Sequence, residues 1–179
     1  MGWMDRLRGA GRPTEATPAR IAESVAVVVT QRADHLMAEL RQARPPQNEA
    51  SFMMECLIFS AFPFDVIICA EFGPHADAIR TKLREQLFRA LQAVIEALPM
   101  EMFPEFADHF QETTTNYVKV WTSATGGPGL ERLGRAAGQA IRGPGVTLGM
   151  TEILTCSALA QEAFASFKGL SSKYKVVTP

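Results

Sequence analysis

The side chains best suited to chemistry lie in one stretch near the middle of the sequence. Glu105, His109, Glu112 and Asn116 follow one another at intervals of three or four residues, which places them along one ridge of a predicted helix. A carboxylate and an imidazole one helical turn apart can hold a divalent metal ion, because both then point at a common space. The ridge is therefore a candidate surface for binding a metal ion or a partner.

A second carboxylate–imidazole pair, Glu71 and His75, has the same four-residue spacing. If this pair met Glu105 and His109 between helices, the four side chains would form a site for a metal-dependent enzyme. A Gly-Pro step separates Glu71 from His75, however, and the Glu-x-x-His spacing of di-iron helical bundles is absent. We therefore favour a solvated ridge and expect no cofactor, with a divalent metal ion as the alternative.

The same region is acidic. No lysine or arginine occurs between Arg89 and Lys119. The five acids in this interval are Glu96, Glu101, Glu105, Asp108 and Glu112. They form either a docking surface for a basic partner or a solvated face that pairs with arginines from elsewhere in the fold, and we favour the second. The arginines considered for this pairing are Arg132, Arg135 and Arg142.

Residues 51–72 are apolar nearly all round, which predicts a buried helix kinked or broken at Pro63. Phe59, Phe62 and Phe64 could hold a small hydrophobic ligand, so a carrier or sensor of such a ligand is a further alternative. Asp65 stands out among these apolar residues. It either faces a cavity or caps a helical segment that restarts after Pro63, and we favour the cap.

A stretch this apolar also raises the question of a membrane-spanning helix. Glu55, Pro63 and Asp65 argue against one, because a carboxylate at the centre of a bilayer costs roughly 3 kcal/mol. At the N-terminus, Trp3 and Leu7 alternate with Arg6 and Arg8, a composition that allows weak contact with a membrane surface. We favour a mobile or folded-back head over such contact.

The pattern of apolar residues predicts an all-α fold. Helical spacing recurs in six segments, with capping residues or Gly and Pro at their boundaries, and no stretch shows the alternation of a strand. We expect a single-domain bundle of about six helices over residues 17–170, with the second and last helices largely apolar and buried. Residues 1–16 are predicted to form a flexible head and residues 171–179 a tail. Gly134 and Gly138 are predicted to allow close packing of the fifth helix.

No catalytic motif accompanies this fold. The three cysteines match neither a disulfide framework nor a zinc-ligand spacing, and residues 1–20 lack the apolar core of a signal peptide, so we expect a cytoplasmic protein. The formal net charge of −1 gives no support for nucleic-acid binding. The leading hypothesis is a helical binding module that acts through a protein partner or through self-association as a homodimer, rather than an enzyme.

Overall fold

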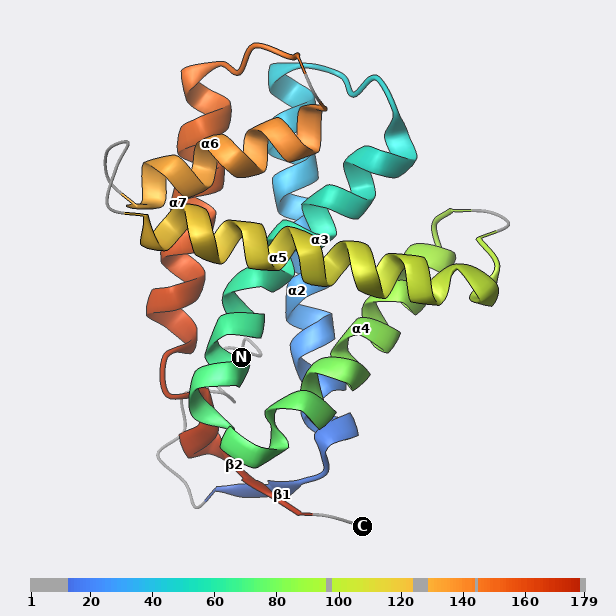
Figure 1. Ribbon diagram of the computed structural model, residues 1–179, viewed down its shortest axis with the longest axis vertical. Helices are drawn as coiled ribbons and strands as arrows, with labels where there is room; N and C mark the ends of the chain where they lie inside the picture. Colours follow the sequence, from blue (N-terminus) through green and yellow to red (C-terminus); the bar gives the residue numbers. More distant parts are fainter. Residues whose placement is uncertain (1–12, 96–97, 124–128, 144, 178–179) are drawn as a thin grey trace.

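The computed structural model describes residues 13–95, 98–123, 129–143 and 145–177. The described part of the chain contains six α-helices, which confirms the predicted all-α single-domain bundle (Figure 1). These helices are α2 (Pro18–Ala43), α3 (Glu49–Glu71), α4 (Ala76–Gln92), α5 (Phe103–Thr122), α6 (Gly129–Arg142) and α7 (Met150–Phe167). Short 3-10 helices are η1 (Gly73–His75), η2 (Met100–Met102) and η3 (Leu170–Lys173).

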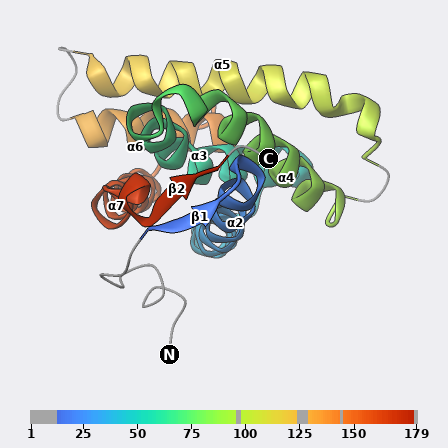
Figure 2. The same cartoon turned by 90° about the horizontal axis from the view of Figure 1, so that it is seen from below.

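The central helix is α3, which packs against α2, α4, α5, α6 and α7. Figure 2 shows α5 along one side of the bundle and α2 on the opposite side, with α3 between them. Among the described helices, α3 is the one long and apolar enough to cross a membrane by length and composition, yet 83% of its most apolar window is buried by the rest of the protein. The prediction of an apolar, buried second helix is confirmed.

Helix α3 runs without a break through Pro63, so of the predicted kink or break at this position the break is wrong. Proline removes one backbone hydrogen bond and normally interrupts a helix. Here Pro63 is buried, and packing of the neighbouring helices against α3 outweighs the local preference. Asp65 lies inside the helix and is therefore not an N-cap.

The first two helices begin where their capping residues predict. The Thr17 side chain accepts a hydrogen bond from the Arg20 amide, and Pro18 occupies the first helical position of α2. The Asn48 side chain accepts a hydrogen bond from the Ser51 amide at the start of α3. These caps fix the points at which the chain enters α2 and the central helix α3.

A short strand pair joins the two ends of the described chain. Strand β1 (Thr14–Ala16) pairs in parallel with β2 (Tyr174–Val176), at the lower end of the molecule in Figure 1. The expectation that the fold contains no strand is therefore wrong. Three residues are too few to show an alternating pattern, and a pairing partner 160 positions away leaves no local signal.

Helix α7 buries one face against α3 and α6, while Met150 and Leu154 are exposed. The approach of α6 to α7 depends on Gly134, where a Cβ atom would lie within 3.0 Å of the Ser157 hydroxyl and of the Ile153 carbonyl oxygen. This confirms the close helix packing predicted for Gly134. Gly138 faces the flexible end of Leu148, at 3.1 Å from where its Cβ would lie.

Candidate functional site: two cavities that share His109

Helix α5 crosses over α3 and α4 (Figure 1). His109 lies in its second turn. Its buried residues Phe106, Phe110 and Tyr117 face the core, because they recur at the spacing of one helical face. The opposite face presents polar side chains to solvent. Because of this amphipathic pattern, α5 packs against the central helix α3 and carries the ridge that was predicted from the sequence.

Two cavities meet at His109. The first, which we call the polar cavity, has a volume of about 670 Å³ and is formed mainly by polar residues of α5 together with Glu55 of α3. The second, which we call the apolar groove, has a volume of about 330 Å³ and lies between α3, α4 and α5. The groove is lined by Ala50, Ser51, Met54, Phe88, Leu91, Ile95, Leu98, Met102, Glu105, Phe106 and His109.

His109 is held by a carboxylate from the central helix. Its Nε2 atom lies 2.6 Å from Oε1 of Glu55, whose residue is only 7% exposed. An ionised carboxylate only accepts hydrogen bonds, so Nε2 donates and the ring presents its other nitrogen to the surroundings. The His109 side chain is 40% exposed. Glu55 was not among the site residues predicted from the sequence, although a carboxylate in an apolar stretch was the available signal.

Two buried polar atoms beside this pair have no hydrogen-bond partner among the described residues. They are Oε2 of Glu55 and the hydroxyl oxygen of Tyr117, and both side chains line the polar cavity. Burial raises the pKa of Tyr117 well above its usual value, and the nearby Glu55 carboxylate raises it further. Phe59 and Phe62 pack edge-on against the Tyr117 ring, with centroids 5.6 and 5.5 Å away.

The predicted ridge residues divide between the two cavities. Glu112 and Asn116 line the polar cavity, Glu105 lines the apolar groove, and His109 lines both. Among the residues that the structure describes, no three histidine, cysteine or carboxylate side chains form a group able to hold a metal ion.

The second carboxylate–imidazole pair lies elsewhere and has a different role. The Glu71 carboxylate accepts hydrogen bonds from the amides of Gly169 and Ser171, at 2.6 and 2.9 Å, and so holds the chain that follows α7. His75 ends the short helix η1, after the turn at Gly73. The two predicted pairs are therefore not brought together as a four-residue site.

The phenylalanines predicted to hold a hydrophobic ligand belong to the core. Phe59, Phe62 and Phe64 are at most 1% exposed, so a ligand at these positions would have to displace other helices. Asp65, expected to cap a helix, instead forms a two-point ion pair with Arg80 of α4, with Oδ1–Nε at 2.7 Å and Oδ2–Nη2 at 2.9 Å. The apolar surface that stays open lies instead in the apolar groove between α3, α4 and α5.

The arginines expected to neutralise the acidic face have other partners. Arg135 pairs with Glu131, and Arg132 donates to backbone carbonyl groups at the end of α5. Arg142 pairs with Glu152. The predicted pairing of Arg135 and Arg142 with the acidic face is therefore wrong. The proposed membrane-contact residues Trp3, Arg6, Leu7 and Arg8 lie outside the described residues.

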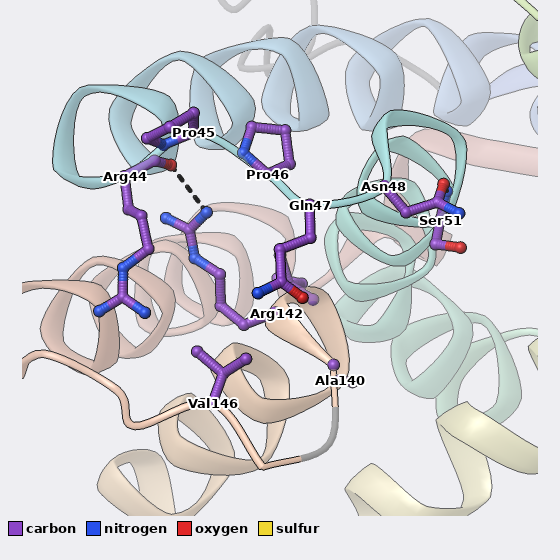
Figure 3. A pocket seen from close by; sticks show the side chains of 11 residues that line it. Arg44, Pro45, Pro46, Gln47, Asn48, Ser51, Ala140, Arg142 and Val146 are labelled. Carbon is purple, nitrogen blue, oxygen red and sulfur yellow. Dashed lines mark hydrogen bonds between the residues drawn. The ribbon is translucent and has the colours of Figure 1, made fainter.

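Arg142 lies beside a third cavity of about 180 Å³, shown in Figure 3. Its guanidinium donates to Glu152 Oε1 at 2.6 Å, to the Arg44 carbonyl at 2.8 Å and to the Leu40 carbonyl at 2.6 Å. All three guanidinium nitrogens are thus occupied, and the charge is paired. This cavity belongs to a structural junction between α2, α6 and α7 rather than to an open site.

Comparison with protein families, with curated proteins and with solved structures finds no match to this chain. We therefore infer a function from the geometry of the two cavities at His109.

Proposed function

We propose that this chain is a protein-binding module whose apolar groove receives an apolar segment of a partner that also carries lysines or arginines. The observation that carries the proposal is an open cavity of about 330 Å³ with mostly apolar walls and a carboxylate at its edge. Apolar surface that remains open in a folded domain is typical of binding sites.

The walls of the groove suit a helical or extended peptide. Phe88, Leu91 and Phe106 are buried and form a firm floor, whereas Met102 is 44% exposed at the edge. Met54 also lines the groove. Methionine side chains are flexible and polarizable, so they adapt to different apolar partners, as in grooves that bind amphipathic helices.

The charge at the groove selects for a basic partner. Glu105 lines the groove, and the neighbouring Glu101 is exposed on η2. The sequence has no lysine or arginine from residue 90 to residue 118 that could neutralise these carboxylates. Complementary charge accelerates association and excludes acidic competitors.

The experiment uses a defined probe, a fluorescent amphipathic peptide of roughly 18 leucine and lysine residues, titrated with the protein and followed by anisotropy. We expect saturable binding that weakens about tenfold or more in Met102→Lys, because a lysine at the edge places a like charge in the path of the peptide. Met150→Lys is the matched control, since Met150 is 63% exposed on α7, away from the groove. Its affinity should equal that of the wild type.

A second pair of variants tests the contribution of charge. Glu105→Lys should weaken peptide binding, whereas Glu39→Lys, on an exposed part of α2, should not. Equal affinity for a leucine–glutamate peptide would contradict the proposal, as would equal weakening by Met102→Lys and Met150→Lys. Saturable binding of an uncharged apolar dye without peptide binding would favour a small-ligand site, and a concentration-dependent dimer in sedimentation that Met102→Lys abolishes would favour self-association.

A further inference from the structure

One stretch of the chain has the composition that the apolar groove selects. Residues 1–12, which we call the N-terminal segment, contain the apolar side chains Trp3, Met4 and Leu7. They also contain three arginines and one aspartate, which give a formal charge of +2. The groove is proposed to bind an apolar segment that carries basic residues, and the N-terminal segment meets both requirements. It lies outside the described part of the chain.

The other stretches outside the described part do not share this composition. Residues 96–97, 124–128, 144 and 178–179 contain neither an aromatic side chain nor a lysine or arginine. Among these stretches, the N-terminal segment alone supplies both apolar contacts and positive charge.

The spacing of its apolar residues suits a groove. Trp3 and Leu7 are four positions apart and Met4 and Leu7 are three apart, so in a helix all three side chains would share one face. Amphipathic helices bind apolar grooves through side chains at this spacing. In the same helix Arg6 and Arg8 would flank that face. Tryptophan and arginine are also the residue types that most often dominate the energy of protein interfaces.

The surface around the groove complements this segment. Val94 precedes the groove residue Ile95 and is 64% exposed. Met100 lies two positions before the groove residue Met102 and is 52% exposed. Exposed apolar side chains beside an open groove indicate a surface that a partner covers. Glu105 lines the groove and is exposed, so it provides the negative charge that an arginine-bearing partner requires.

The same chain has little length with which to fill its own groove. The N-terminal segment precedes β1, at the lower end of Figure 1, and β1 leads into α2. The α3 wall of the groove begins at Ala50, just past the opposite end of α2, whose 26 residues span roughly 39 Å. Trp3 lies eleven positions before Thr14, which even a fully extended chain stretches to only about 36–40 Å. A segment from a second copy has no such limit.

We propose that the N-terminal segment of one copy of this chain docks in the apolar groove of a second copy. Reciprocal docking closes a twofold dimer, because each copy contributes one segment and one groove. This inference rests on the proposed function and names the partner: the basic apolar segment belongs to another molecule of the same chain.

The first test is sedimentation equilibrium of the full chain across roughly 1–500 µM. We expect a dimer whose dissociation constant rises about tenfold or more in Trp3→Asp, because this change removes a large apolar side chain and adds a charge of the same sign as Glu105. Val27→Asp is the matched control, since Val27 is 56% exposed on α2, away from the groove. It should dimerise as the wild type does.

A mixture of two variants distinguishes this arrangement from contact between two grooves. Met102→Lys damages the groove and keeps the N-terminal segment, whereas Trp3→Asp damages the segment and keeps the groove. Fluorescently labelled Met102→Lys should therefore sediment together with Trp3→Asp, but not with an excess of unlabelled Met102→Lys. Circular dichroism of each variant confirms that its helix content is that of the wild type.

A synthetic peptide of residues 1–12 tests the contact directly. We expect saturable binding to the full-length Trp3→Asp variant, and binding about tenfold weaker when Arg6 and Arg8 of the peptide are replaced by glutamate. If the leucine–lysine peptide binds and this peptide does not, the proposed function stands and the second copy is not the partner. If neither peptide binds, both proposals fail.

Three results of these experiments overturn docking in a second copy. One is a monomer at every concentration. Another is a dimer that Met102→Lys abolishes and Trp3→Asp leaves intact, which would mean that two grooves pack together. The third is a monomeric wild type that binds the peptide of residues 1–12 more weakly than Trp3→Asp does, which would place the segment in the groove of its own chain.

Discussion

Each of two regions of this bundle contains a buried glutamate, and the hydrogen bonds of its carboxylate differ between the two. At the junction of α2, α6 and α7, both oxygens of Glu152 are satisfied, Oε1 by Arg142 at 2.6 Å and Oε2 by the Gly149 amide at 2.7 Å. Where α5 crosses α3, Glu55 has one oxygen on His109 and the other without a partner among the described residues. The two carboxylates are similarly buried, at 3% and 7% exposure.

This difference in hydrogen bonding distinguishes a structural carboxylate, Glu152, from the carboxylate of the candidate functional site, Glu55. A carboxylate with every oxygen paired to a buried arginine or a backbone amide stabilises one arrangement of helices and leaves nothing for a ligand. A half-satisfied carboxylate, beside a half-buried histidine and an unsatisfied tyrosine hydroxyl, contributes less to stability. We therefore expect mutations at the junction to cost more stability than mutations at the α3–α5 crossing.

The largest effect is expected from Arg142→Met. This change leaves the buried Glu152 carboxylate without its cation and leaves the Leu40 and Arg44 carbonyls without a donor. Breaking a buried ion pair by removing one partner costs about 3–5 kcal/mol of the free energy of unfolding. Urea denaturation followed by circular dichroism measures this loss in the free energy of unfolding. The double variant Arg142→Met, Glu152→Met should recover part of the loss, and a loss below about 1 kcal/mol in the single variant would show that the junction is not a stabilising clamp.

A smaller effect is expected from Gly134→Ala, also in the α6–α7 region. The new methyl group would lie within 3.0 Å of a backbone carbonyl oxygen, that of Ile153, which cannot move without shifting α7. Overpacking of this kind costs about 1–3 kcal/mol. Gly138→Ala is the control, because it meets only the end of the Leu148 side chain and gains helix propensity of up to about 1 kcal/mol. Equal destabilisation of the two variants in urea would contradict the close contact.

The pH dependence of stability should report on the same junction. Burial acts to raise the pKa of Glu152, but hydrogen bonds from the Gly149 amide and from Arg142 outweigh it and hold the pKa below its usual value of 4.5. A carboxyl whose pKa is lowered in the folded state contributes stability above its unfolded pKa, and this contribution is lost as the pH falls through the folded pKa. Glu152→Gln should therefore flatten the acid side of the stability profile. A profile that falls as steeply as that of the wild type would contradict this assignment.

The elements could be predicted from the sequence because their signals are local. Thr17 and Asn48 cap the first two helices as expected, and the apolar character of residues 51–72 correctly predicts a buried central helix. Of the kink or break predicted at Pro63, the break is wrong, because packing of the neighbouring helices against α3 overrides the local preference of proline.

The site could be predicted only in part. The ridge that contains His109 and Glu112 was visible as helical spacing, but the partner of His109 is Glu55, 54 positions earlier and on another helix. Asp65 pairs with Arg80 across two helices in the same way. Such contacts depend on how helices are placed relative to one another, and a single sequence contains no local trace of that placement.

The most direct test compares the free energies of unfolding of Glu55→Gln and Glu152→Gln, measured in urea at neutral pH. We expect Glu152→Gln to lose about 2–4 kcal/mol, because it leaves Arg142 as an unpaired buried charge. Glu55→Gln should change stability by less than about 1 kcal/mol, since the glutamine keeps one hydrogen bond to His109 and removes a half-satisfied charge. Equal losses in the two variants would mean that Glu55, like Glu152, is a structural residue, and would contradict the distinction between the junction and the α3–α5 crossing.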